Sequence, residues 1–125
     1  MRLVLGAGAL IAIDRGDRRV AALIALGRRT GAELVTVAPV VAQAWRDGAR
    51  QALLSRALPM IEVVPTDLGA AKRAGELLRS SSGSHVVDAL LVLAARPGDQ
   101  VLTSDPRDIG ALLTAQGVEA RVLPV

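Results

Sequence analysis

The sequence has 125 residues, a length that fits one domain over residues 1–125. Its formal net charge of +3 is compatible with a polyanionic partner. Hydrophobic residues make up 51% of it, aromatic residues only 1% and cysteine none, so an Ala, Val, Leu and Ile core must form without disulfides, and thiolate metal sites are excluded. No apolar run approaches the roughly 18 residues that cross a bilayer, and the N-terminal residues fit a strand rather than a signal peptide, so we expect a cytoplasmic protein without a membrane partner.

Strand and helix signals alternate along the chain. Short apolar runs predict strands at residues 2–5, 33–37, 61–64, 101–103 and 119–123. Helical spacing, capping residues and prolines predict helices at residues 9–13, 17–29, 39–46, 50–58, 66–79 and 106–116, and one more on the run 86–95. Among the expected helix N-caps are Asp17, Thr66 and Ser84. This alternation predicts an α/β fold, a three-layer α/β/α sandwich with a mainly parallel central sheet.

The turn after the first strand contains Gly6 and Gly8, as a dinucleotide-binding fingerprint would. Ile11 replaces the third glycine of that pattern, and no acidic residue ends the second strand to hold a ribose. We therefore interpret both glycines as a tight strand-to-helix turn. A phosphoacceptor receiver domain is excluded as well, because Asp67 lies one residue too late after the third strand.

Two isolated carboxylates lie on segments otherwise built for burial. Asp88 interrupts the apolar run 86–95, and Asp105 follows the strand 101–103, where open α/β sheets place their ligands. Asp108 lies one helical turn beyond Asp105. Carboxylate oxygens are hard ligands that suit Mg²⁺ or Mn²⁺. The pattern therefore predicts a divalent-metal site at Asp88 and Asp105, to which Asp108 would add a third ligand.

Each of these carboxylates also has a structural interpretation. Asp105 precedes Pro106 and suits the N-cap position of a helix, and Asp108 in the first turn favours the helix dipole. Asp88 could pair with a structural arginine instead of a metal, because an unpaired buried carboxylate is very costly. The residues alone leave both interpretations open.

Three short motifs follow one another along this pattern of elements: Leu-Ile-Ala at 10–12, Val-Asp-Ala at 87–89 and Thr-Ser-Asp at 103–105. In their order and separation they resemble the PIN-domain family, and within it the VapC toxins of bacterial toxin–antitoxin pairs. The likeness covers essentially the whole chain. It implies a metal-dependent ribonuclease whose acidic residues hold Mg²⁺ or Mn²⁺, a homodimer, and inhibition by a cognate antitoxin.

The chain departs from the family pattern at two acidic positions. Gly6 stands after the first strand where the family has a carboxylate, and Gln43 stands at the second acidic position, where its amide carries no charge. Asp14 cannot replace the first acid, because a helix would place it about 12 Å beyond Gly6. The resemblance thus leaves Asp88 and Asp105 as catalytic metal ligands, and one hypothesis is that Gly6 is an attenuating substitution.

Any contact with RNA must run through phosphates, because a chain with almost no aromatic residues cannot stack several bases. Arg46, Arg50 and Arg107 are the predicted RNA-binding residues. Trp45 is expected in the core or at an interface, and His85 at the surface. Two functions remain open: an attenuated metal-dependent endoribonuclease, or a degenerate PIN module that binds an antitoxin or RNA without cleaving it.

Overall fold

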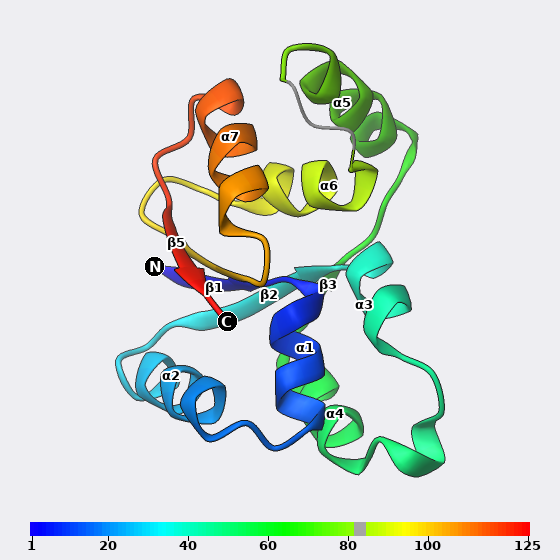
Figure 1. The fold of residues 1–125 in the computed structure, drawn as a ribbon, viewed down its shortest axis with the longest axis vertical. Helices are drawn as coiled ribbons and strands as arrows, with labels where there is room; N and C mark the ends of the chain where they lie inside the picture. The colour runs from blue at the N-terminus through cyan, green and yellow to red at the C-terminus, as the bar shows by residue number, and fades with distance from the viewer. Residues whose placement is uncertain (82–84) are drawn as a thin grey trace.

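The computed structural model describes residues 1–81 and 85–125, and at its centre lies a sheet of five parallel strands (Figure 1). The strand order is β3-β2-β1-β4-β5. In the chain these strands are β1 (Arg2–Leu5), β2 (Glu33–Val37), β3 (Glu62–Val64), β4 (Gln100–Thr103) and β5 (Arg121–Pro124). Val4 of β1 pairs with Val35 of β2 on one side and with Val101 of β4 on the other. The prediction of a mainly parallel sheet is confirmed, since every strand pair is parallel.

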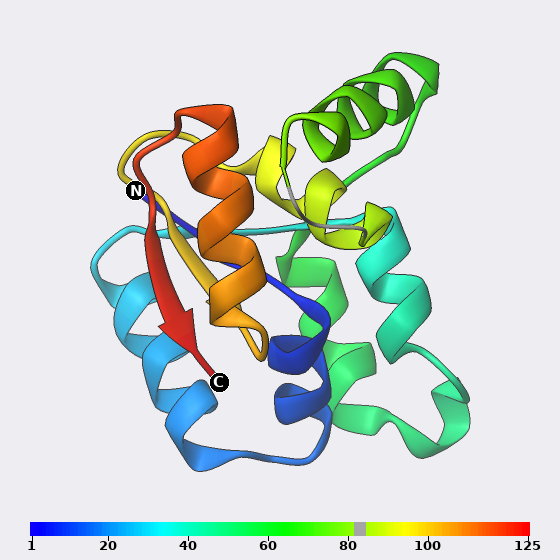
Figure 2. The same cartoon turned by 45° about the horizontal axis from the view of Figure 1, so that its top comes forward.

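Helices cover both faces of this sheet, which makes the three layers predicted from the alternation of elements. One face carries α1 (Ala7–Asp14), α2 (Arg18–Arg29) and α4 (Ala52–Ala57), and α3 (Ala38–Ala44) follows directly from the carboxyl end of β2. The other face carries α6 (Val86–Ala94) and α7 (Pro106–Gln116), and α5 (Leu68–Arg79) packs chiefly on α6. Figure 2 shows α7 running alongside β5 on this face.

The core is aliphatic because the central strands are buried on both faces. The side chains of Leu3, Val4 and Leu5 in β1 are almost completely buried, as are those of Val101 and Leu102 in β4. Such continuous apolar runs are typical of parallel strands covered by helices on both sides. Among residues 1–81 and 85–125, no helix combines the length and apolar character needed to cross a membrane.

Several predicted boundaries shift, and the shifts have local causes. The Asp17 carboxylate caps α2 by accepting from Val20 N at 3.0 Å, as expected. The cap of α5 is Asp67, not Thr66, because the Asp67 carboxylate accepts from Ala70 N at 2.8 Å. Ser84, the cap expected for α6, lies outside the described residues, and His85 holds the N-cap position.

The helix expected over residues 50–58 is divided into shorter pieces. A turn of 3-10 helix, η1 (Gly48–Arg50), precedes α4, and a second, η2 (Leu58–Met60), follows it with Pro59 inside. Gln51 separates η1 from α4, and its side chain bonds to the end of α3 at Ala44 O and to the loop that follows it, at Arg46 N and Asp47 N. The last strand spans Arg121–Pro124 rather than residues 119–123, and the Glu119 carbonyl accepts from Gly98 N in the loop before β4.

Candidate metal centre

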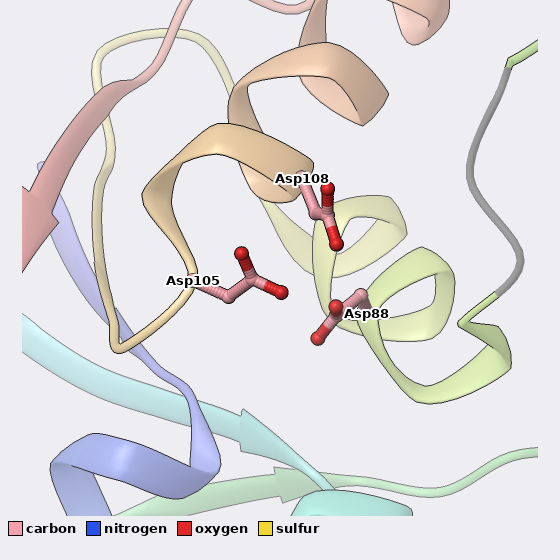
Figure 3. Close-up of side chains that lie close together, drawn as sticks. All are labelled: Asp88, Asp105 and Asp108. Atoms are coloured by element: carbon pink, nitrogen blue, oxygen red, sulfur yellow. The ribbon is translucent and has the colours of Figure 1, made fainter.

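Three aspartates converge beyond the carboxyl end of β4. Asp105 occupies the N-cap of α7, Asp108 lies in the first turn of that helix, and Asp88 lies in the first turn of α6. Figure 3 shows their carboxylates turned toward one another, and one oxygen from each lies within 4.8 Å of the other two. The two neighbouring helices thus deliver three anionic oxygen ligands to one point, and the predicted trio is brought together.

The carboxylate of Asp105 is free of the capping role that the sequence also allowed. Asp105 stands at the N-cap with Pro106 at the first helical position, yet its side chain makes no capping hydrogen bond. The backbone N–H of Asp105 donates instead to Thr103 Oγ1 at 2.9 Å, which fixes the turn after β4. Helix capping therefore does not account for the direction of this side chain, and its carboxylate is available to a cation.

Asp88 is half-buried, and among the described residues no cationic partner lies at salt-bridge distance from it. The ion pairs found among residues 1–81 and 85–125 join Arg2 to Asp99 and Arg50 to Asp47, and His85 lies 3.9 Å from Asp108, so no structural arginine takes Asp88. Burial raises the pKa of Asp88, and the nearby carboxylates of Asp105 and Asp108 raise it further, against a lowering by His85. A group of carboxylates that destabilise one another's ionised forms is stabilised when a divalent cation joins them.

A cavity of about 390 Å³ adjoins the three aspartates. Asp88 and Asp105 line it, whereas Asp108 lies at the margin and is joined to His85 at 3.9 Å. Both of the positions where the PIN resemblance expects further acids, Gly6 and Gln43, line the same cavity. The remaining lining residues come from the start of α1, from α3, from α6 and from the turn after β4, and they are Ala7, Gly8, Ile11, Val40, Arg46, His85, Val86, Val87, Leu91, Thr103 and Ser104.

The start of α1 forms one wall of this cavity, and its close approach to the turn after β4 requires glycine at position 8. A Cβ on Gly8 would lie 2.7 Å from the Cβ of Ser104, so only glycine lets α1 approach the turn that carries Asp105 so closely. The expected tight strand-to-helix turn is at Gly6, the one residue between β1 and α1, whereas Gly8 lies inside α1. Both glycines also line the cavity, which their spacing alone did not indicate.

The other residues singled out from the sequence lie around this centre at different distances. Asp14 stands at the far end of α1, outside the acidic cluster, as its spacing from Gly6 predicts. Of the three predicted RNA-binding arginines, Arg46 lines the cavity, and Arg50 and Arg107 are exposed outside its lining. Trp45 is 36% exposed and its ring lies against Gly48, so it is only partly in the core.

Sequence reasoning missed Gln51, a buried polar residue just behind this site. Its side chain bonds to the backbone on both sides of Arg46. No motif marks such a residue, because its partners are set by the path of the loop from α3 to η1. The only signal in the sequence is a lone glutamine before an apolar helix.

The mutual repulsion of the carboxylates leads to a stability prediction. We expect Asp88→Asn to raise the melting temperature of the metal-free protein by a few degrees at neutral pH, because it removes a charge whose ionisation the fold disfavours. Since the folded pKa of Asp88 lies above its ordinary value of 3.8, the destabilisation is complete above that folded pKa and disappears as the pH falls toward 3.8. Thermal melts in EDTA across this pH range measure the difference.

The same melts test the metal. A ligand that binds only the folded state stabilises it by about 2.7 kcal/mol at a hundredfold excess over its Kd. Mn²⁺ should therefore raise the melting temperature of the parent protein and have little effect on Asp88→Asn. A parent whose melting temperature does not respond to millimolar Mn²⁺ would contradict a metal site at these aspartates.

The residues present fit a hard divalent cation, on the evidence of three convergent carboxylate oxygens beside a cavity. The donor set is all oxygen and anionic, which suits a hard cation better than a soft metal. No protein-family model matches this sequence, and no curated protein matches it either.

Proposed function

We propose that this chain is a PIN-like, metal-dependent endoribonuclease of the VapC toxin type, attenuated because Gly6 replaces a carboxylate ligand. The observation that carries the proposal is the convergence of Asp88, Asp105 and Asp108 at a cavity that Gly6 and Gln43 also line. Two positions that are far apart in sequence, and that the PIN resemblance assigns to one acidic site, thus face one space with the acids that remain.

In this proposal each residue has a defined task. Asp88, Asp105 and Asp108 hold one Mg²⁺ or Mn²⁺, which when bound supplies positive charge for the phosphodiester and lowers the pKa of water. Gln43 offers a neutral amide to the substrate or to a water molecule. Arg46 faces a phosphate oxygen of the RNA. His85, the single histidine of the chain, also lines the cavity, and its imidazole offers a general base beside the cation.

The alternative is a degenerate PIN module that binds an antitoxin or RNA without cleaving it. It is favoured by the absence of charge at Gly6 and Gln43, the two lining positions where the resemblance expects acids. All three carboxylates of the cluster come from α6 and α7. Affinity for hard cations follows the number of anionic ligands, so this loss should weaken metal binding.

Calorimetric titration with Mn²⁺ separates the two functions. Binding well below millimolar concentration that disappears in Asp105→Asn, together with slow cleavage of a single-stranded RNA that EDTA stops, would support the ribonuclease. Absence of Mn²⁺ binding at millimolar metal would support the degenerate module. Asp47→Asn is the matched control, because it removes one exposed aspartate charge that does not line the cavity.

Assembly is the remaining part of the proposal. The exposed apolar side chains of Leu53 and Met60 line a groove of about 320 Å³ between α2, α4 and η2. Contiguous exposed apolar surface of this kind usually marks an interface. We expect a homodimer, and an antitoxin segment seated in such a groove. Sedimentation equilibrium at tens of micromolar should give a dimer, and a clean monomer there would count against this expectation.

A further inference from the structure

The loop between α3 and η1 is organised by one buried amide, that of Gln51. Gln51 Oε1 accepts from Arg46 N at 2.7 Å and from Asp47 N at 2.9 Å. Gln51 Nε2 donates to Ala44 O at 2.9 Å and to Asp14 Oδ2 at 3.4 Å. The oxygen thus meets two donors and the nitrogen meets two acceptors, so every partner fits the orientation of the amide.

These bonds fix the residue that lines the acidic cavity. Arg46 is the first residue beyond the C-cap of α3, where the backbone leaves the helix. Gln51 holds its backbone N–H, and the guanidinium NH1 donates to Ala42 O at 2.9 Å and Trp45 O at 2.7 Å. The guanidinium therefore rests on the carboxyl end of α3, where the negative end of the helix dipole favours a cation.

Arg46 has no carboxylate partner among the described residues. None of the ion pairs found among residues 1–81 and 85–125 includes it, although Asp88 and Asp105 line the same cavity. A guanidinium fixed in place, with donors left over and no carboxylate partner, is suited to a phosphate oxygen. Holding it in advance reduces the side-chain entropy that binding would otherwise cost.

We infer that Gln51 is a positioning residue that holds Arg46 to contact a backbone phosphate of single-stranded RNA at the rim of this cavity. The identity of the ligand rests on the proposed function. Gln51 itself touches no ligand, because it is buried behind the loop and is not among the residues that line the cavity. Its effect must therefore pass through Arg46.

The test uses the salt dependence of binding, measured by fluorescence anisotropy with a labelled oligouridylate in Mg²⁺ and again in EDTA. Each phosphate contact to a single strand contributes about −0.7 to the slope of log K against log salt. Arg46→Ala should weaken binding about tenfold or more and make the slope shallower by about 0.7. Gln51→Met, although it changes no charge, should produce the same two changes, and the double variant should be no worse than Arg46→Ala.

Two further variants keep this result specific. Arg121→Ala removes an equal charge at the amino end of β5, away from the carboxyl ends where the cavity lies, and should leave affinity and slope near the parent values. If Gln51→Met does not fold, Gln51→Asn serves instead, since its amide is one methylene too short to reach the Arg46 backbone. A merely structural role for Gln51 would lower the melting temperature and leave the slope of the folded protein unchanged.

The inference is overturned if the Gln51 variant keeps the parent slope while Arg46→Ala loses it, or if neither differs from the parent. It is overturned too if the parent binds no oligouridylate in either Mg²⁺ or EDTA. The proposed function fails differently: RNA binding with the expected Arg46 and Gln51 effects, but without Mn²⁺ binding or cleavage, would refute the nuclease and leave this positioning role intact.

Discussion

Gly6→Asp is expected to raise Mn²⁺-dependent cleavage of RNA by about a hundredfold or more, the size of effect that a few kcal/mol of added transition-state stabilisation produces. Gly6 lines the cavity that Asp88 and Asp105 also line, so an added carboxylate there increases the anionic ligands from three to four. Mn²⁺ affinity measured by calorimetry should rise with the cleavage rate.

The backbone at Gly6 accepts a side chain. Its φ of −81° and ψ of 176° are ordinary extended values, so an L-residue meets no left-handed strain there. An added Cβ would lie 3.1 Å from the Leu102 carbonyl oxygen and 3.4 Å from Leu91 Cδ2. The first contact is tight and requires a shift of a few tenths of an ångström. We therefore expect a small loss of melting temperature in EDTA, which the added metal affinity offsets in Mn²⁺.

Two controls accompany this variant. Gly6→Asn has nearly the same shape without the charge and should bind Mn²⁺ no better than the parent. Asp88→Asn introduced beside Gly6→Asp should abolish the gained activity, because it removes one ligand charge with little change of shape. A folded Gly6→Asp protein that binds Mn²⁺ no better than the parent would decide for the degenerate module. Full activity in the parent, unaffected by Asp88→Asn, would refute the site.

Asp99→Asn is expected to give the largest loss of stability, about 3 kcal/mol or more in the free energy of unfolding measured with urea. Asp99 is 3% exposed and accepts from Arg2 N at 3.0 Å, from Arg2 Nε at 3.2 Å and from Arg2 NH2 at 2.8 Å. It also accepts from Arg96 N at 2.8 Å. The pair of Arg2 and Asp99 ties β1 to the turn before β4. The variant leaves the buried charge of Arg2 without its counter-ion.

The effect has a defined pH dependence. Burial by itself raises the pKa of Asp99, but the hydrogen bonds from Arg2 and from Arg96 N outweigh it and hold that pKa below its ordinary value of 3.8. The contribution to stability is therefore fully present above pH 3.8 and is lost as the pH falls through the lowered folded pKa. The parent and the variant should converge in stability under strongly acidic conditions.

Asp47→Asn is the matched control for this prediction. Asp47 forms an exposed ion pair with Arg50 at 3.8 Å, and asparagine can still cap Ala49 N. Exposed ion pairs contribute about 0–1 kcal/mol, so this variant should stay close to the parent. An Asp99→Asn protein as stable as Asp47→Asn would show that the buried pair contributes far less than its geometry indicates.

Much of the candidate site was predictable because its signals are local. Asp88 stands out as a charge inside an apolar run, and Asp105 stands out as an acid directly after a buried strand. In a sheet of parallel strands the carboxyl ends meet at one edge, so grouping these two acids required only the fold class. Asp108 followed from the helical spacing of three residues. The structure adds that their oxygens lie within one cation's reach, at most 4.8 Å apart.

What the sequence left undecided is which of two local roles each side chain takes. An aspartate before proline fits a helix cap and a metal ligand equally well, and only the tertiary structure leaves the Asp105 side chain without a capping bond. Likewise, a charge in an apolar run requires a partner, and only the packing of the helices shows that no arginine takes Asp88 among the described residues. These choices depend on neighbours that are distant in the chain.

The sequence by itself determined the layers, the parallel direction of the strands and the acids that belong near one edge, because periodicity and the order of elements are local properties. The tertiary structure decided the strand order, the buried pair of Arg2 with Asp99, which lie 97 residues apart, and the amide of Gln51 behind Arg46. Such polar contacts cannot be predicted from the sequence, because a buried donor or acceptor bonds to the partner that the complete fold brings within reach. No periodic pattern in the sequence indicates that partner.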